Sequence, residues 1–384
     1  MTSSLTVAID YLPALHHGFG IGRYVANLVP ALLEADPGLR LKLYGVFLRN
    51  RRERIAAHDF PDPSRATFHS LPLPARFVPA LARFLPLSAR TFMGPFDLFH
   101  DTDYFVAPVR ARPRVATLYD TAYLKDLGFV DEGQSEKMYA TVQRLIAGAT
   151  RIITISEFAR SELVREFRLD PERISVTYLG VDPLFRREPA EEEIEETLLS
   201  FGLERPYGVF IGTLEPRKNL LRIIRAFARL LEIAPEYQLV LIGRRGHNHR
   251  LILDLIEDLE IQDAVHWLGR LPDRQTFLLL KGAQMLVYPS LYEGFGLPAL
   301  EGMAAGIPVL SSASHALREV CGNGALLVNP RDEGEIFEGM RLLALDRGEA
   351  LEIADRGRAR AAGFTWERCA RQTLDAYRAT LEES

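Results

Sequence analysis

Short apolar runs alternate with amphipathic stretches along this chain, a pattern typical of parallel strands covered by helices. In the first half, helical periodicity predicts helices at 22–34, 132–148 and 157–167. The last of these begins after Ser156, a favourable N-cap residue. Strands are predicted at 5–9, 41–47, 67–71, 98–100, 115–119, 151–155 and 174–178.

The pattern is interrupted at 182–196, an acidic, proline-bearing stretch that predicts a linker and then a helix. Alternation then restarts, with helices predicted at 218–231 and 333–345. We therefore predict an α/β fold of two doubly wound domains, at 1–182 and 183–364, with ligands in the cleft between them. The strands predicted for the second domain are 207–213, 237–243, 264–269, 283–290, 307–312 and 324–330.

Composition narrows the classes of function. The 384 residues, 47% hydrophobic and 25% charged, are typical of a globular chain with more than one core. A net charge of −5 argues against a nucleic-acid partner. The two cysteines, Cys321 and Cys369, give neither a disulfide framework nor a zinc site. Neither a signal peptide nor a membrane-spanning segment is evident, so we expect a cytoplasmic protein.

Ligands of such sheets bind at the carboxyl ends of strands, which directs attention to three loops. The first, "GFGIGRY", follows the first strand and carries Gly18, Gly20 and Gly22 before a helix. Glycines there permit close backbone approach, and free N–H groups at the helix start can bind an anion. An ordinary flexible loop is the alternative interpretation.

The second loop, "IGTLEPRKNL", follows the first strand of the second domain. Gly212 and Thr213 end that strand, and Arg217 and Lys218 fall at the predicted start of the next helix. Cations there oppose the helix dipole unless an anion lies between them, and a diphosphate would remove the conflict. The alternative is a pair of solvated surface charges.

The third loop, "LYEGFGLPALEG", places Glu293 in a glycine-rich bend and Glu301 in the helix that Pro298 begins. Carboxylates accept hydrogen bonds from pairs of hydroxyls, so a sugar and a ribose are fitting partners. Two solvated acids near a helix start are the alternative.

These motifs together resemble family 4 of the retaining nucleotide-sugar glycosyltransferases, which have two facing Rossmann-like domains in the GT-B architecture. The pair Glu293 and Glu301 is similar to the family's paired-glutamate element, "GTLEPRKNL" to its phosphate-binding Arg-Lys pair, and "GFGIGRY" to its amino-terminal glycine loop. The segments "ALREVCGNGALLVNP" and "FTWERCARQTLDAYRATL" also look like the family. The resemblance implies that a last helix at 365–384 returns to the first domain.

The resemblance also implies a role for each donor-side residue. Glu293 would lie by the donor sugar, and Glu301 would bind the ribose hydroxyls. Arg217 and Lys218 would neutralise the diphosphate leaving group in place of a metal, so we expect neither metal nor cofactor. The backbone N–H groups expected to reach the sugar and phosphate are those of Phe295, Gly296 and Leu297.

On the acceptor side the chain departs from the family. Where the family commonly has His-Asp after a strand, this sequence has Tyr119 and Asp120. A tyrosine can donate one hydrogen bond but cannot act as a base in the way a histidine can. His100 is another strand-end residue and a second candidate, although a structural role is its alternative. The acidic "DTD" at 101–103 looks like an acceptor-side loop rather than a metal site.

The segment 74–92 interleaves arginines with Phe and Leu and contains no acid. Such a segment can rest on an anionic membrane surface. Its prolines weaken a continuous helix, and an amphipathic segment that packs on the protein is the alternative. The arginines of 63–95 are Arg65, Arg76, Arg83 and Arg90.

The function predicted is therefore retaining transfer of a sugar from a nucleoside diphosphate to a hydroxyl of a glycan or lipid-linked acceptor. The motifs "GFGIGRY" and "LEPRKN" look most like those of family members that use GDP-mannose, and UDP-sugars are the alternative donors. The family often builds lipopolysaccharide or other cell-surface glycans. Two further alternatives are a binding protein that has lost turnover, which Tyr119 suggests, and a nucleotide-sugar epimerase.

Overall fold

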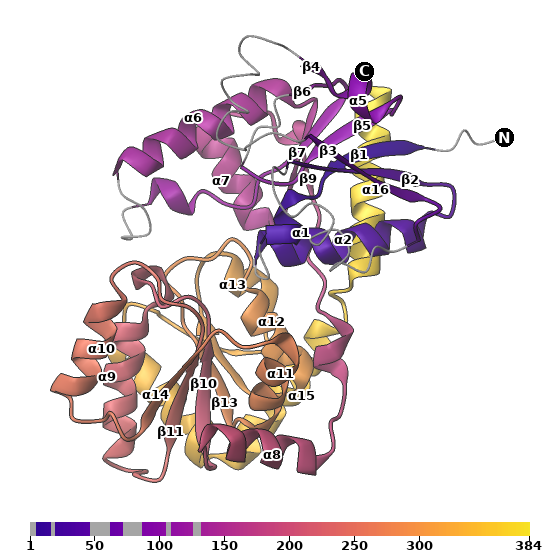
Figure 1. The fold of residues 1–384 in the computed structure, drawn as a ribbon. Helices are drawn as coiled ribbons and strands as arrows, with labels where there is room; N and C mark the ends of the chain where they lie inside the picture. The colour runs from indigo at the N-terminus through magenta and orange to yellow at the C-terminus, as the bar shows by residue number, and fades with distance from the viewer. Residues whose placement is uncertain (1–4, 17–19, 47–61, 72–86, 105–108, 126–131) are drawn as a thin grey trace. The chain divides into compact units, whose positions relative to one another are not determined.

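The chain forms two compact units in a computed structural model (Figure 1). The structure describes residues 5–16, 20–46, 62–71, 87–104, 109–125 and 132–384. One unit comprises Met1–Asp120, Gly133–Gly180 and Thr365–Ser384, and the other Thr121–Glu132 and Val181–Phe364. The chain therefore divides between Gly180 and Val181, and Thr121–Glu132 groups with the second unit although the predicted first domain includes it.

The first unit is a parallel sheet of seven strands in the order β3-β2-β1-β5-β7-β8-β9. Its central strands are buried on both faces because helices cover them, which explains their apolar sequences. Its strands are β1 (Thr6–Asp10), β2 (Arg40–Val46), β3 (Ala66–Leu71), β5 (Leu98–Asp101), β7 (Arg114–Thr117), β8 (Arg151–Thr154) and β9 (Ile174–Val176), with a separate short pair of β4 (Leu87–Ser88) and β6 (Val109–Arg110).

Two helices of the first unit begin at residues whose side chains cap them. Ser156 accepts a hydrogen bond from Ala159 N at the start of α7, and Thr365 does the same for Arg368 N at the start of α16. The chain passes closely at that second point, since a Cβ on Gly180 would lie 2.2 Å from Trp366 N. The helices are α1 (Leu12–His16), α2 (Ile21–Ala35), α5 (Ala89–Met93), α6 (Glu132–Gly148), α7 (Glu157–Phe167) and α16 (Trp366–Glu382), with the 3-10 turn η3 (Pro171–Arg173). The 3-10 turn η2 (Ala122–Leu124) groups with the second unit.

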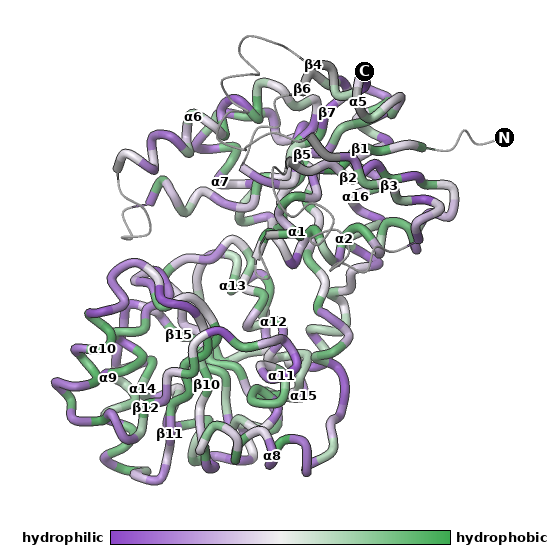
Figure 2. The backbone as a smooth tube through the Cα atoms, in the orientation of Figure 1, coloured by the Kyte–Doolittle hydropathy of each residue, from purple (hydrophilic) through white to green (hydrophobic). Residues whose placement is uncertain are grey.

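The second unit is a parallel sheet of six strands in the order β12-β11-β10-β13-β14-β15. Figure 2 shows the contrast between its hydrophobic central strands and its more hydrophilic outer segments. The predicted linker contains the 3-10 turn η4 (Pro183–Arg186) and the start of α8 (Glu191–Phe201). The strands are β10 (Tyr207–Ile211), β11 (Gln238–Ile242), β12 (Val265–Gly269), β13 (Met285–Tyr288), β14 (Val309–Ser312) and β15 (Leu326–Val328).

Helix α9 (Leu220–Leu231) shows how this unit builds its core, because its buried residues recur at the spacing of one helix face. By contrast, the short α12 is buried on nearly all sides. The remaining helices are α10 (His249–Asp258), α11 (Asp273–Gly282), α12 (Leu297–Ala305), α13 (His315–Cys321), α14 (Glu333–Leu345) and α15 (Arg347–Ala361), and η5 (Pro216–Lys218) precedes α9.

Candidate functional site

The loop at 289–296 joins β13 to α12 and carries Glu293. Leu291 N donates to Arg217 O at 2.9 Å, which fixes this loop to the one that follows β10. Gly296 has a φ of 98°, and a Cβ there would lie 2.3 Å from Leu317 Cδ2. The bend before α12 therefore requires glycine.

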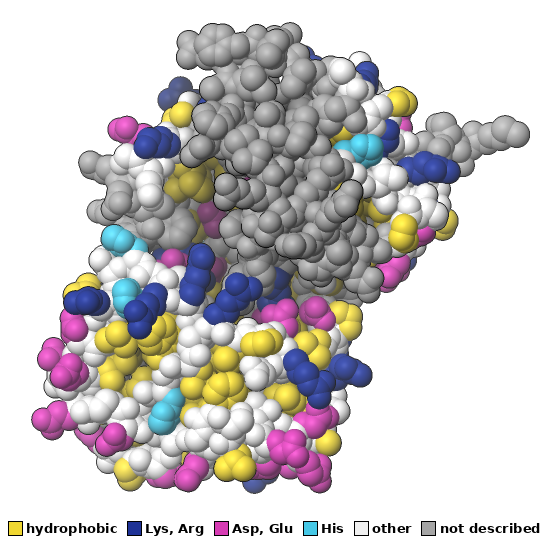
Figure 3. All heavy atoms as spheres, in the orientation of Figure 1, with side chains coloured by type: hydrophobic (Ala, Val, Ile, Leu, Met, Phe, Trp, Pro, Cys, Tyr) yellow, Lys and Arg dark blue, Asp and Glu magenta, His cyan; other side chains and the backbone are white. Residues whose placement is uncertain are grey.

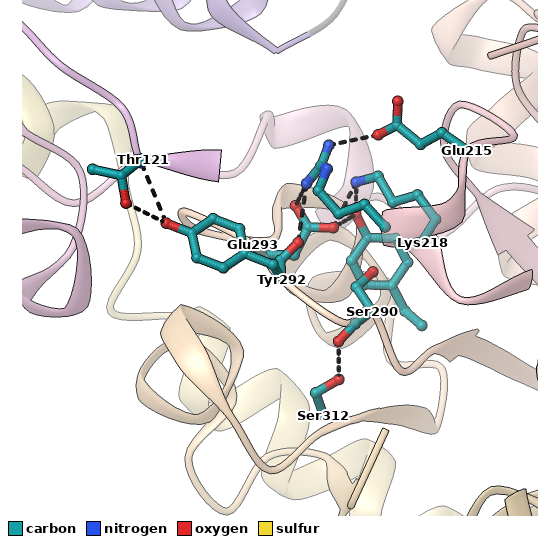
Figure 4. Close-up of polar contacts among 9 residues, drawn as sticks. Thr121, Glu215, Lys218, Ser290, Tyr292, Glu293 and Ser312 are labelled. Carbon is teal, nitrogen blue, oxygen red and sulfur yellow. Dashed lines mark hydrogen bonds and ion pairs between the residues drawn. The ribbon is translucent and has the colours of Figure 1, made fainter. Parts of the chain in front are cut away.

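Four charged side chains meet where β10 and β13 end (Figure 4). Glu293 Oε1 accepts from Lys218 Nζ at 2.6 Å, and Glu293 Oε2 accepts from Arg217 Nη1 at 2.9 Å. Arg217 Nη2 donates to Glu215 Oε1 at 2.7 Å. We call Glu215, Arg217, Lys218 and Glu293 the ion-pair cluster. The structure thus brings together three residues that the sequence predicts and adds Glu215, which sequence reasoning missed.

Neutral groups hold the same carboxylate. Tyr288 Oη donates to Glu293 Oε1 at 2.8 Å and accepts from Lys218 Nζ at 2.7 Å. Arg217 Nη1 also donates to Tyr292 O at 3.0 Å, so the loop backbone positions the guanidinium. Both carboxylate oxygens of Glu293 are therefore held, which fixes its orientation.

Burial gives the cluster unusual electrostatics. Lys218 is 8% exposed and Glu293 is 7% exposed. Burial alone would raise the pKa of Glu293, but the charges of Lys218 and Arg217 outweigh it and lower the pKa to about 2. Burial and the neighbouring Arg217 lower the pKa of Lys218, and Glu293 opposes them. Each charge is tolerated in the interior because its partner is present.

The backbone at Arg217 and Lys218 corrects one prediction. The sequence predicts a helix at 218–231, with both cations at its start and in conflict with its dipole. The structure places them in and around the 3-10 turn η5, and Asn219, with a φ of 66°, separates them from α9. That predicted helix start is wrong, and Glu293 and Glu215 already balance the two charges. The burial of Lys218 also excludes the alternative of solvated surface charges.

Glu301 is the only charged residue of α12 and is 2% exposed. A Cβ on the next residue, Gly302, would lie 2.7 Å from Leu286 Cδ2, so glycine lets α12 pack closely on β13. A buried acid in so apolar a helix is unusual among soluble proteins. The alternative of two solvated acids is therefore excluded for both Glu293 and Glu301.

The loop after β11 packs against the loop that begins with Gly212 and Thr213. Gly246 N donates to Leu214 O at 3.1 Å, and a Cβ on Gly243 would lie 1.8 Å from Gly212 O. Sequence reasoning missed this neighbouring loop, although "RRGHNHR" is a strong signal of positive charge. Figure 3 shows basic and histidine side chains gathered at one end of this unit. The exposed residues of the loop are Arg244, Arg245, His247 and Asn248, and Arg250 is exposed in the first turn of α10.

In the first unit, the glycine loop is described only from Gly20 onward, and Gly18 lies outside the described residues. Gly20 has a φ of 54° and is the N-cap residue of α2. Gly22 is buried in the first turn of that helix. Gly20 is exposed, and among the described residues none lies within 4 Å of a Cβ placed on it.

His100 is a core residue. Its ring is 0% exposed, and its two nitrogens bind Tyr377 Oη at 2.8 Å and Thr117 Oγ1 at 2.7 Å. Burial lowers the pKa of His100 to about 3, so the ring is neutral at physiological pH. The prediction that His100 meets a ligand is therefore wrong in this structure, and the structural alternative holds.

Tyr119 is 7% exposed, and its hydroxyl donates to Thr102 O at 2.5 Å. Its proton is thus used within the chain, and the phenol oxygen can only accept from a ligand. Asp120 is half-buried, and its backbone N donates to Tyr104 Oη at 3.3 Å. The first acid of the "DTD" loop, Asp101, pairs with Arg114.

The basic segment 74–92 lies mostly outside the described residues, since 72–86 are not described. Arg90, which is described, donates to Phe96 O at 3.2 Å and to Arg112 O at 3.4 Å. Within the described ranges, no helix combines the length and apolar character needed to cross a membrane.

Two parallel-sheet, Rossmann-like units in one chain define the GT-B class, and the solved structures confirm this fold. Sucrose-phosphate synthase from Thermosynechococcus elongatus has a TM-score of 0.76 at 20% identity, over 99% of this chain and 100% of that one. Residues 193–360 match the family described as "Glycosyl transferases group 1", and residues 20–185 match "Glycosyltransferase Family 4". The chain belongs to this group 1, family 4 set of glycosyltransferases.

Two of the chain's relatives are named as mannosyltransferases. "O-antigen chain mannosyltransferase B" of Escherichia coli is 32% identical over 372 residues, which are 94% of this chain and 96% of that protein. "MMP alpha-(1->4)-mannosyltransferase" of Mycolicibacterium hassiacum is 33% identical over 242 residues, which are 61% of this chain and 55% of that protein.

Proposed function

We propose that this glycosyltransferase moves a sugar, with mannose favoured, from a nucleoside diphosphate to a hydroxyl of a glycan or lipid-linked acceptor, with retention of configuration. The observation that carries the proposal is the ion-pair cluster at the ends of β10 and β13. Mannose and a place in cell-surface polysaccharide synthesis are favoured because both relatives above are named mannosyltransferases, one of them for the O-antigen chain. GDP as the carrier is favoured by the sequences of the motifs.

The donor-side roles follow from charge and position. Arg217 and Lys218 counter the charge that develops on the diphosphate as it departs, which is the work a metal does elsewhere, so we propose metal-independent transfer without a cofactor. Glu301 accepts from the ribose hydroxyls, and Glu293 adjoins the sugar. Backbone groups that approach the donor belong to Gly20, Gly22, Gly212, Thr213, Phe295, Gly296 and Leu297.

In the transfer step, the bond between the anomeric carbon and the phosphate oxygen breaks, and a bond to the acceptor oxygen forms on the same face of the sugar. The acceptor's proton passes to the departing phosphate oxygen, so no protein base is required. Tyr119 and Asp120 then serve to position the acceptor side, which agrees with a tyrosine whose own proton is engaged.

The test is incubation of the full chain with GDP-mannose, UDP-glucose and a hydroxyl acceptor, with the released nucleoside diphosphate measured. Proton NMR of the product reports the anomeric configuration, and excess chelator tests the need for a metal. Binding of the donor without transfer would support the binding-protein alternative. Conversion of the donor without any acceptor would support an epimerase.

Peripheral contact with an anionic membrane through 74–92 is part of the same proposal. Because Arg90 is bound to backbone carbonyls, Arg76 and Arg83 would carry that contact. Co-sedimentation with anionic vesicles should weaken in an Arg76→Glu/Arg83→Glu variant. Vesicle binding that changes neither with the two substitutions nor with the content of anionic lipid would contradict this contact.

A further inference from the structure

The ion-pair cluster balances its own charge. It contains two acids, Glu215 and Glu293, and two bases, Arg217 and Lys218, and each cation contacts an acid at 2.9 Å or less. The Glu293 carboxylate reaches both cations at once, with one oxygen on each. As it stands, the cluster offers a diphosphate no net positive charge.

Both cations of the cluster are also largely buried. The side chains of Arg217 and Lys218 are 13% and 9% exposed, so most of each cation is covered by its own partners. A diphosphate can contact both cations only if it displaces a group that is now bound to them. The member of the ion-pair cluster that contacts both cations is the carboxylate of Glu293.

We propose that Glu293 is an internal competitor of the donor diphosphate, which selects anions able to replace it on Arg217 and Lys218 together. This inference rests on the proposed function for the nature of the ligand. Carboxylate and phosphate oxygens accept from guanidinium and ammonium groups in the same geometry, so one can substitute for the other. Gly294 directly follows Glu293, and a glycine gives the backbone beside that side chain the conformational freedom that such an exchange requires.

Electrostatics makes the exchange all-or-none. If Glu293 moves away alone, two buried cations lose their counter-charge, which is strongly unfavourable. The carboxylate therefore leaves only as another anion arrives. A pyrophosphate group brings at least about two negative charges to the two cations, whereas a single phosphate at about pH 6 brings mostly about one, the same as the carboxylate that it would replace. The displaced carboxylate then stands next to the sugar, where the proposed function needs it.

The experiment uses inorganic pyrophosphate and inorganic phosphate as probes, with binding to the full chain measured by calorimetry. Glu293→Gln keeps the shape of the side chain and removes its charge. We expect it to bind pyrophosphate at least about tenfold more tightly than the wild type, and to discriminate less between pyrophosphate and phosphate. Because Glu293 helps keep Lys218 protonated, the comparison is made at about pH 6.

Glu352→Gln is the matched control, since Glu352 belongs to the same unit, loses the same charge and has a side chain 73% exposed. It should bind both probes as the wild type does. Tyr288→Phe provides a second variant, because it removes the hydrogen bond that Tyr288 Oη donates to Glu293 and the one that it accepts from Lys218, and it keeps all four charges of the cluster. It should give a smaller gain in pyrophosphate affinity, and it carries the test if Glu293→Gln does not fold.

Unchanged or weaker pyrophosphate binding in these variants would overturn the inference, as would unchanged discrimination against phosphate in Glu293→Gln. The proposed function is tested separately, by sugar transfer. If Glu293→Gln binds pyrophosphate more tightly but the wild type transfers no sugar, the internal competitor stands and the proposed function fails. If the wild type transfers sugar but Glu293→Gln binds pyrophosphate no more tightly, the proposed function stands and the internal competitor fails.

Discussion

Acid is expected to weaken the second unit through Glu293. The pKa of this carboxyl group is about 2 in the folded protein against an ordinary value of 4.5. A group whose pKa is lower when folded contributes its full stability above the unfolded pKa and loses it as the pH falls through the folded pKa. The contribution of Glu293 is therefore complete above pH 4.5 and is lost by about pH 2.

The magnitude follows from the same difference. At about 1.4 kcal/mol for each tenfold change in proton affinity, the gap between 4.5 and about 2 corresponds to about 3 kcal/mol of unfolding free energy. The source is visible in the cluster, where Lys218 and Arg217 each hold one carboxylate oxygen. Glutamine does not titrate, so the difference between the wild type and Glu293→Gln isolates this residue.

The two tryptophans make the assay specific. Trp267 lies in β12 of the second unit, where its Nε1 donates to Gly243 O at 2.8 Å, whereas Trp366 lies in the first unit. In a Trp366→Phe background, urea unfolding followed by fluorescence therefore reports the second unit. The unfolding free energy of the wild type should fall relative to Glu293→Gln by about 3 kcal/mol between neutral and strongly acid pH.

Glu352→Gln, in the same background, serves as control, because its ion pair with Arg356 is exposed and such pairs contribute little. Its difference from the wild type should not vary with pH by a comparable amount. A wild-type curve that runs parallel to that of Glu293→Gln down to pH 2 would refute the reasoning, since the charges around Glu293 would then not favour its ionised form.

Three further predictions concern the other site residues. Glu301→Gln should weaken GDP binding about tenfold in calorimetry, the loss of a charge-assisted hydrogen bond worth about 1.5 kcal/mol, and equal affinity would remove Glu301 from the ribose. Tyr119→Phe should lower the stability of the first unit by about 1 kcal/mol, read from Trp366 fluorescence, because Thr102 O loses its donor. Burial lowers the pKa of His100 from 6.5 to about 3, so between these two pH values the unfolded chain binds a proton at His100 and the folded chain does not. The first unit should therefore lose stability as the pH falls below 6.5, and a His100→Gln variant that retains the same slope would contradict this.

Local signals in the sequence were sufficient for much of the fold. Helices α6 (Glu132–Gly148) and α7 (Glu157–Phe167) begin and end at the predicted residues. For α7 the reason is local, since Ser156 caps its start and Arg168, with a φ of 54°, ends it. The apolar runs likewise predict every strand of the two large sheets within a few residues. The central strands are the clearest, because strands covered on both faces must be apolar throughout.

Other elements depend on contacts that no local pattern encodes. The strands β4 and β6 are two residues each and are too short to show periodicity. The turn at Arg217 and Lys218 is set by Pro216 before it and by Asn219, whose side chain donates to Pro289 O and Pro330 O from distant loops. Glu215 could be identified as a partner of Arg217 only once that turn was known.

The same reasoning explains why two residues near strand ends, Glu293 and His100, have different surroundings. His100 lies inside β5, whose residues are all buried, so its side chain must find its partners in the core. One of them, Tyr377, is 277 positions away on α16, and only the return of that helix to the first unit supplies it. Glu293 lies beyond β13 in a glycine-rich loop, where the backbone is free to turn its carboxylate toward the cations of the neighbouring strand end. In this chain the polar residue within the covered strand is therefore held in the core, and the one just past a strand joins the ion-pair cluster.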